Sequence, residues 1–298
     1  MKIGITGGTG GLGKRLTQYL ISKGYQVKVL VRKTSQVDDL IKWGTEIIYG
    51  DITDPVSLVR FIQGIDICYH LAAQVSSATK EQLYQVNVIG TQNVCEAILK
   101  YNPYCRLIYC STITVKNVNV LSSIFLSNYT ISKYKAEQIV DKYSTKNHLK
   151  VSIIYPGYIY GPYDQNFMPN ILNMLKYGLK FTIKGGERNA PVIYIDDLCE
   201  LFHMAGIKDI ALGKKYISLK PNEIGIHGFL KIVADKMNYP FPNKKYPKLP
   251  LILISFLLDK GYKLLGLKST PKINMRVIGA LSNNAKYFND NAVQELGW

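Results

Sequence analysis

The sequence is poor in cysteine and in acidic residues, and it has no long apolar run. Its five cysteines include no C-x-x-C pair, so they indicate reduced thiols rather than a disulfide framework or a metal site. Its most apolar stretch, residues 249–266, is shorter than the ~20 apolar residues of a transmembrane helix. Met1 leads directly into a strand-like run, so no signal peptide and a cytoplasmic location are expected.

Acidic side chains are outnumbered by basic ones, 21 against 37, which gives a formal charge of +16. Residues 201–298 carry 15 Lys and Arg against 6 Asp and Glu, a net of +9. A positive field attracts phosphorylated cofactors, nucleic acid or acidic lipid. No basic run with interleaved aromatic residues occurs, so nucleic acid is not an expected partner. The favoured interpretation is a Lys-rich solvated surface, and peripheral membrane contact through residues 249–266 is the less favoured alternative.

Apolar strand-like runs alternate with amphipathic helix-like segments through the first half of the chain. The strand-like runs are residues 2–7, 26–32, 46–51, 66–73, 106–112 and 150–157. This alternation predicts an α/β fold, a doubly wound parallel (Rossmann) sheet with a smaller mixed C-terminal substrate domain. The expected division is a dinucleotide-binding domain at 1–155, to which 190–220 return, and a substrate-binding subdomain at 156–189 and 221–298. We expect residues 249–266 to form a buried helix of that subdomain.

The stretch "TGGTGGLG", residues 6–13, lies between the first strand-like run and a helix. Its glycines have G-x-x-G-x-x-G spacing, which permits a tight turn and a close approach of the backbone to a pyrophosphate at the helix N-terminus. Because the motif joins a strand to a helix, it predicts a dinucleotide site. The expected cradle comprises Gly7, Thr9, Gly10, Gly11, Leu12 and Gly13.

The end of the second strand indicates which dinucleotide binds. A carboxylate for the ribose hydroxyls of NAD is absent there: Val31 takes its place and is followed by Arg32 and Lys33. Two cations suit a 2′-phosphate, so we expect NADP(H), with NAD as the second choice and an ordinary exposed turn as the alternative. Asp51 and Ile52, at the next strand end, are expected to contact the adenine.

A tyrosine and a lysine four residues apart share a helix face at Tyr129–Lys133. The same spacing occurs at Tyr19–Lys23 and Tyr216–Lys220, so the spacing alone proves nothing. Only Tyr129–Lys133 follows a strand that ends in hydroxyl residues, which include Ser111 and Thr112. This context favours a proton-transfer function for the pair.

Several segments together resemble the extended short-chain dehydrogenase/reductases, often called NAD-dependent epimerase/dehydratases. The matching stretches are residues 6–13, 50–54, 70–73, 87–94, 129–137, 155–162 and 192–198. The apolar stretch 249–266 is similar to hydroxysteroid dehydrogenase-like and dihydroflavonol reductase-like members.

The resemblance implies functions for individual residues. Tyr129 would exchange a proton with the substrate, while Lys133 would hold the ribose and lower the pKa of Tyr129. Thr112 takes the place of the catalytic serine, with Ser111 next in line, and Asn87 would have a structural or water-holding function. Further cofactor contacts are implied for Leu71, Ala72, Ala73, Pro156, Gly157 and Ile159. Asp196 and Asp197 are expected to cap a helix, and a homodimer through the Tyr–Lys helix is a further possibility.

The sequence departs from the family pattern at Tyr155, where an Arg is common, and at 189–191, where sugar-nucleotide members have an Arg-Asp pair. These departures weaken the case for a nucleotide diphosphate substrate. We therefore expect an NAD(P)-dependent oxidoreductase acting on an alcohol or ketone of a bulky, fairly apolar small molecule. The alternatives are a nucleotide-sugar epimerase/dehydratase with retained NAD and a non-catalytic dinucleotide-sensing protein. No metal is expected.

Overall fold

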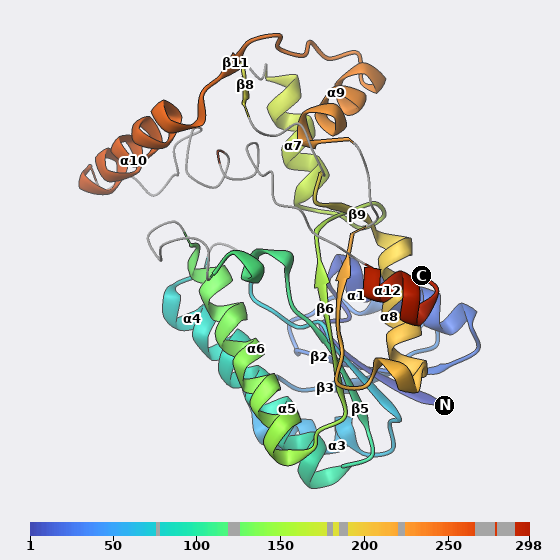
Figure 1. Ribbon diagram of the computed structural model, residues 1–298. Helices are drawn as coiled ribbons and strands as arrows, with labels where there is room; N and C mark the ends of the chain where they lie inside the picture. The colour runs from blue at the N-terminus through green and yellow to red at the C-terminus, as the bar shows by residue number, and fades with distance from the viewer. Residues whose placement is uncertain are drawn as a thin grey trace. The chain divides into compact units, whose positions relative to one another are not determined.

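The chain forms two units in the computed structural model, which describes residues 1–75, 78–118, 126–177, 181–184, 190–219, 224–265, 278 and 290–298 (Figure 1). The first unit comprises Met1–Asp164, Ile193–Ser218 and Asn289–Trp298, and the second comprises Gln165–Val192 and Leu219–Phe288.

A seven-stranded parallel sheet in the order β10-β6-β5-β4-β1-β2-β3 forms the centre of the first unit. Its strands are β1 (Lys2–Thr6), β2 (Gln26–Val31), β3 (Glu46–Tyr49), β4 (Ile67–His70), β5 (Arg106–Cys110), β6 (Val151–Pro156) and β10 (Lys215–Ser218). The strand order reverses between β1 and β4, and ligands of such sheets bind at the carboxyl ends of the strands at that point. The predicted doubly wound fold is therefore confirmed.

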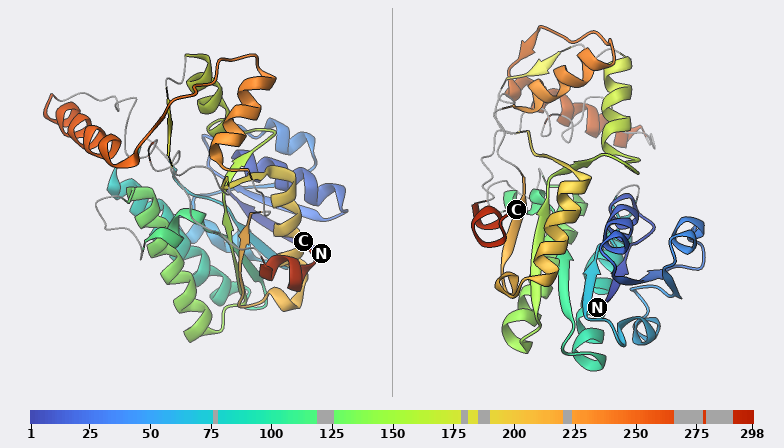
Figure 2. Two further views of the ribbon diagram at one scale, coloured as in Figure 1. Left: turned by 45° about the horizontal axis from the view of Figure 1, so that its top comes forward. Right: turned by 90° about the vertical axis from the view of Figure 1, so that its right-hand side faces the viewer.

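Helices cover both faces of this sheet (Figure 2). One face carries α3 (Pro55–Ile62), α4 (Lys80–Tyr84), α5 (Gly90–Tyr101) and α6 (Asn128–Asn147), with a π-helical turn at Gln85–Ile89 between α4 and α5. The other face carries α1 (Gly11–Ser22), α8 (Ile195–Ile207) and α12 (Asp290–Leu296). Because both faces are covered, all six residues of β6 are buried.

Shorter elements complete the first unit. They are α2 (Asp38–Lys42), the 3₁₀ helices Ile113–Asn117 and Asp209–Ala211, and β7 (Tyr158–Tyr160). Strand β7 pairs with β9 (Val192–Tyr194), whose first residue belongs to the second unit.

The C-terminal segment packs on the sheet unit. Glu295 accepts hydrogen bonds from Tyr216 Oη at 2.8 Å and Lys214 Nζ at 2.7 Å, and the Trp298 indole donates to the Asp197 carbonyl at 2.9 Å. The division expected from the sequence therefore differs from the structure at its boundaries. Residues 190–192 and 219, expected in the sheet domain, lie in the second unit. Residues 289–298 and 156–164 lie in the first unit.

The second unit has its own apolar core. Its elements are α7 (Phe167–Lys176), β8 (Thr182–Ile183), α9 (Ile226–Lys236), β11 (Lys245–Tyr246) and α10 (Lys248–Leu264). Leu175 of α7 and Leu230 of α9 are completely buried in this core, to which α10 contributes Leu251. Most of α10 is exposed, so the expectation of a buried helix at 249–266 was wrong. No described helix combines the length and apolar character needed to cross a bilayer.

Candidate active site

The glycine loop turns tightly between β1 and α1. Gly7 has φ +77°, and a Cβ there would lie 2.6 Å from the Ala72 backbone nitrogen. A Cβ on Gly13 would lie 2.2 Å from the Gly7 carbonyl oxygen. Since real Cβ atoms do not approach backbone so closely, the sequence needs glycine at both positions.

The N-terminus of α1 is open to an anion. Its N-cap, Gly10, offers no side chain, and the first turn contains no acidic residue. A Cβ on Gly10 would meet only the Gly7 carbonyl, at 3.4 Å. The first-turn N–H groups and the positive end of the helix dipole therefore suit a pyrophosphate, and the loop fits the dinucleotide that the sequence predicts.

A buried histidine fixes the strand ends at the switch point. Thr91 Oγ1 donates to the Asn87 carbonyl at 2.7 Å, so it accepts a hydrogen bond from His70 Nε2–H at 3.0 Å. Thr6 Oγ1, 2.7 Å from His70 Nδ1, then donates to that nitrogen and accepts from Ala72 N–H at 3.3 Å. Burial and the nearby Lys133 charge lower the pKa of His70 to about 3, so the ring is a neutral positioning group.

The ends of β2 and β3 lie at the same sheet edge. Val31 is buried, whereas Arg32 and Lys33 are exposed and accessible to a phosphate. One Asp51 oxygen already accepts from the Thr53 amide at 2.9 Å and from its hydroxyl at 2.8 Å. Ile52 is buried. Asp51 is thus held in a local turn, with its second oxygen uninvolved in these bonds.

The predicted Tyr–Lys pair lies in the first turns of α6. Ser127 caps the N-terminus of this helix, and its Oγ accepts a hydrogen bond from Thr130 N–H at 3.1 Å. Lys133 is 2% exposed, and its Nζ donates to the Cys110 carbonyl at 2.7 Å. That Nζ also lies 4.3 Å from the ring centroid of Tyr109. Helix α6 therefore fixes the lysine against the end of β5.

Burial dominates the ionisation of both groups in the cofactor-free protein. It lowers the pKa of Lys133 to about 8, because a charged ammonium is poorly solvated there. It raises the pKa of Tyr129 above the ordinary phenol value. The sequence-based expectation was the opposite shift for Tyr129, and burial is the reason for the difference.

The two candidate hydroxyls at the end of β5 have different partners. Ser111 is buried and donates to Glu137 Oε2 at 2.8 Å. Thr112 is half-buried, and its Oγ1 lies 3.3 Å from Thr114 Oγ1, to which Thr130 Oγ1 donates at 3.2 Å. This chain of hydroxyls runs from Thr112 to the residue next to Tyr129. Ser111 is thus committed to a buried carboxylate, and Thr112 stays the candidate that the resemblance favours.

Asn87 is a clamp between a loop and α6. Its Oδ1 accepts from Gln74 N–H at 2.7 Å, and its Nδ2 donates to the Gln74 carbonyl at 3.0 Å and to Ser132 Oγ at 2.9 Å. Ser132 in turn donates to the Tyr129 carbonyl at 2.8 Å. Asn87 thus has a structural function: it joins the loop at Gln74 to helix α6. Its π-helical setting is common near functional sites.

A buried carboxylate that the sequence analysis missed lies one helical turn beyond Lys133. Glu137 accepts from Ser111, from Tyr155 Oη at 2.5 Å and from Lys215 Nζ at 3.3 Å. Lys116 Nζ lies 3.8 Å from the Tyr155 ring centroid. The sequence signal that could have identified Glu137 is its position four residues after Lys133, on the same helix face.

The remaining predicted residues have the following surroundings. Pro156 ends β6 and is buried, while Gly157 and Ile159 are half-buried beyond it. Leu71 N–H donates to the Thr6 carbonyl at 3.1 Å, which holds residues 71–73 beside the glycine loop. Asn189 and Lys220 lie outside the described residues.

Asp196 does not cap α8, contrary to expectation. Its two oxygens accept from Arg15 Nε at 2.5 Å and Nη2 at 2.7 Å, so it joins α8 to α1. The N-cap residue is Tyr194, and no side-chain cap hydrogen bond forms there in the described chain.

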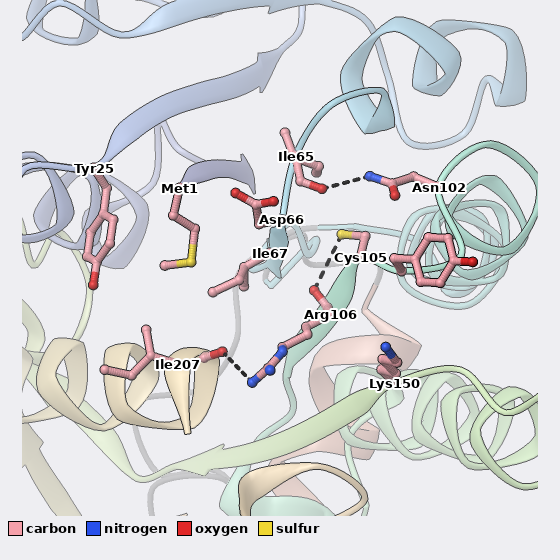
Figure 3. Close-up of a pocket in the computed structure, with 12 residues that line it drawn as sticks. Met1, Tyr25, Ile65, Asp66, Ile67, Asn102, Cys105, Arg106, Lys150 and Ile207 are labelled. Carbon is pink, nitrogen blue, oxygen red and sulfur yellow. Dashed lines mark hydrogen bonds between the residues drawn. The ribbon is translucent and has the colours of Figure 1, made fainter. Parts of the chain in front are cut away.

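A hollow of about 700 Å³ lies at the opposite, amino-terminal edge of the sheet (Figure 3). Its lining includes Asp66, Asn102 and Arg106. Arg106 donates there to the Gly206 carbonyl at 3.4 Å, and Asn102 donates to the Ile65 carbonyl at 2.7 Å. It contains none of the predicted site residues.

Proteins of known activity resemble this chain at low identity. It is 27% identical over 274 residues to 3beta-hydroxysteroid-dehydrogenase/decarboxylase isoform 2 of Arabidopsis thaliana, which covers 84% of this chain and 48% of that protein. The chain thus spans about half the length of that relative. It is 25% identical over 316 residues to 2-alkyl-3-oxoalkanoate reductase of Stenotrophomonas maltophilia, covering 100% and 94%.

A solved structure shows the fold alone. It is DesIV, the dTDP-glucose 4,6-dehydratase of Streptomyces venezuelae, with NAD and TYD bound. The two structures superpose with a TM-score of 0.69 at 20% sequence identity. The match covers 99% of this chain and 95% of the dehydratase chain. Residues 3–216 match the NAD dependent epimerase/dehydratase family, so the chain belongs to that family of enzymes.

Proposed function

We propose that this chain is an NADP(H)-preferring oxidoreductase that interconverts an alcohol and a ketone in a bulky, fairly apolar small molecule. The observation that carries the proposal is the setting of Lys133. It is buried one helical turn from Tyr129, and its Nζ donates to the carbonyl of Cys110, two residues before Thr112 in the chain.

Binding of the cofactor would use the glycine loop and the α1 N-terminus for the pyrophosphate. Arg32 and Lys33 would pair with the 2′-phosphate. The Lys133 ammonium would hold the ribose hydroxyls and orient the Tyr129 phenol. When bound, the nicotinamide supplies the hydride that reduction consumes and accepts the one that oxidation releases.

The protein's own groups handle the proton. Tyr129 Oη would donate its proton to the carbonyl oxygen during reduction and take it back during oxidation. Thr112 Oγ1 would donate a hydrogen bond to the same oxygen. Burial raises the pKa of Tyr129 in the cofactor-free protein, so a nearby cation is needed to lower it for proton transfer.

The substrate class rests on the named relatives. One is a 3beta-hydroxysteroid dehydrogenase/decarboxylase and another is a 2-alkyl-3-oxoalkanoate reductase. The first name describes a hydroxyl group on a steroid skeleton, and the second a ketone on an alkyl-substituted alkanoate. The sequence also has Asn189, Ala190 and Pro191 in the region where sugar-nucleotide members have their Arg-Asp pair, and the absence of an arginine weakens the case for a nucleotide diphosphate.

The second candidate is a nucleotide-sugar epimerase or dehydratase that retains NAD. The family name and the dehydratase structure with NAD and TYD bound favour it. A non-catalytic dinucleotide sensor is the third candidate. The presence of Tyr129, Lys133 and Thr112 in the sequence argues against it, since a sensor does not need groups for proton transfer.

The first experiment needs no substrate. The protein is purified without added cofactor and denatured, and any released nicotinamide is identified by mass spectrometry. In parallel, the purified protein is titrated with NADPH and NADH. An empty site that binds NADPH more tightly supports the proposal, whereas stoichiometric retained NAD would favour the epimerase.

A screen of apolar ketones with NADPH follows, with Tyr129→Phe as the paired variant. This variant is expected to bind NADPH normally and to lose about 10²- to 10⁴-fold in turnover. Equal turnover by both proteins would overturn the assignment of Tyr129.

A further inference from the structure

Helix α10 exposes an apolar surface in the second unit. Leu249 is 79% exposed, Leu253 61% and Leu257 60%, and Phe256, Leu258 and Ile254 are also exposed. Of the side chains described in this helix, only Leu251 and Ser255 are fully buried. The exposed side is therefore more apolar than the buried one. A helix apolar all round normally lies in a core or against lipid.

The unit that contains α10 carries most of the protein's charge. By sequence, residues 165–192 and 219–288 hold 16 Lys and Arg against 4 Asp and Glu, a net of +12. The first unit holds 21 against 17, a net of +4. The apolar helix and the positive field therefore belong to the same unit.

Lysines flank the apolar helix at both ends. Lys244, Lys245 and Lys248 precede or begin it, and all three are exposed. Lys260, near its other end, is exposed with its Nζ 4.7 Å from the Phe256 ring centroid. Long lysine side chains can place their ammonium groups at lipid phosphates while their stems cover apolar surface.

These observations distinguish between the partners that could cover α10. A second copy of this chain would bring another unit of net charge +12 against the first, which opposes pairing through this surface. An anionic lipid surface attracts the same charge and accepts the apolar side chains. A 17-residue helix is about 25 Å long, which suits a helix lying in the plane of the interface.

We propose that α10 is an interfacial helix that docks the second unit on membranes containing anionic lipid. Leu249, Leu253 and Leu257 enter the apolar edge of the lipid layer, and the flanking lysines contact headgroup phosphates. The proposal does not depend on the reaction that the enzyme catalyses.

Vesicle co-sedimentation of the full chain tests the proposal. The vesicles are phosphatidylcholine alone or with about 30% phosphatidylserine, at about 0.1 M and about 0.5 M salt. Binding is expected to require phosphatidylserine and to weaken at high salt. Leu253→Gln/Leu257→Gln, which leaves the charge unchanged, is expected to lower the partition coefficient at least roughly tenfold.

Val56→Gln is the matched control, because Val56 is a 78% exposed apolar residue on α3 in the first unit. It should bind vesicles like the wild type. All three positions are exposed, so the variants are expected to fold, which circular dichroism checks.

Four results would overturn the proposal. The first is no binding to either vesicle, and the second is binding that high salt abolishes and the Leu variants do not change. The third is a concentration-dependent dimer in sedimentation velocity that the Leu variants dissociate. The fourth is a raised KM for a ketone substrate in those variants with unchanged vesicle binding, since α10 would then line the substrate site.

Discussion

Replacing Lys133 by Met should stabilise the cofactor-free protein at neutral pH while abolishing turnover. Lys133 is 2% exposed, and its pKa is about 8 in the folded protein against 10.5 for the free side chain. A difference of this size means that the charged form costs about 3 kcal/mol of folding free energy. Met has a similar length and no charge to desolvate.

The replacement also removes the donor to the Cys110 carbonyl, which costs about 1 kcal/mol. The net gain expected at pH 7 is therefore about 2 kcal/mol. The cost of the charged Lys133 is fully present below the folded pKa of about 8, and it is released as the pH rises toward 10.5. The wild type thus gains stability across that window, and Lys133→Met should become the less stable protein near its upper end.

The assay is denaturant unfolding followed by tryptophan fluorescence at pH 7 and at pH values up to about 10.5. The chain has two tryptophans, Trp43 and Trp298, and both report on the first unit. Lys135→Met is the control, because Lys135 is exposed on the same helix, and it should change stability by less than about 0.5 kcal/mol at either pH. A Lys133→Met protein destabilised equally at both pH values would refute the reasoning.

Three further predictions concern cofactor and substrate contacts. Thr112→Val should lower kcat about 10²-fold and Thr112→Ser should restore it, as steady-state kinetics would show. Arg32→Ala should weaken NADPH binding about tenfold or more and leave NADH binding unchanged in titrations, because it removes a phosphate partner. Gly13→Ala should destabilise the protein by about 1–3 kcal/mol and impair cofactor binding, because its Cβ would lie 2.2 Å from the Gly7 carbonyl. Gly10→Ala, with 3.4 Å of clearance, should impair binding and destabilise the protein less than Gly13→Ala, because only an N-cap preference is lost.

The sheet and the cofactor loop were predictable from the sequence because both depend on local pattern. Strands covered on both faces appear as continuous apolar runs, as in residues 150–157. The spacing of the glycines indicates positions where a side chain cannot fit. At Gly13, a Cβ would lie 2.2 Å from the Gly7 carbonyl oxygen. Neither inference needed knowledge of distant contacts.

Contacts between residues far apart in the chain were not predictable. The acceptor of Lys133 is a backbone carbonyl, which has no residue-type signal. Asp196 looks like a helix cap locally, but Arg15, 181 residues away, binds both its oxygens. The C-terminal helix α12 was assigned to the wrong unit because its polar partners, such as Tyr216 and Lys214, lie on a strand and loop that only the fold brings near.

The network around Glu137 changes what one sequence departure means. The family commonly has an Arg where this chain has Tyr155, and the sequence analysis counted that as a departure from the pattern. In the structure Tyr155 donates to buried Glu137, and Lys215, from β10, supplies the positive charge to the same oxygen at 3.3 Å. Because a buried carboxylate needs both a donor and a counter-charge, Tyr155 and Lys215 together satisfy Glu137. The phenol of Tyr155 is thus committed to a structural contact, and the inference against a sugar nucleotide rests on residues 189–191.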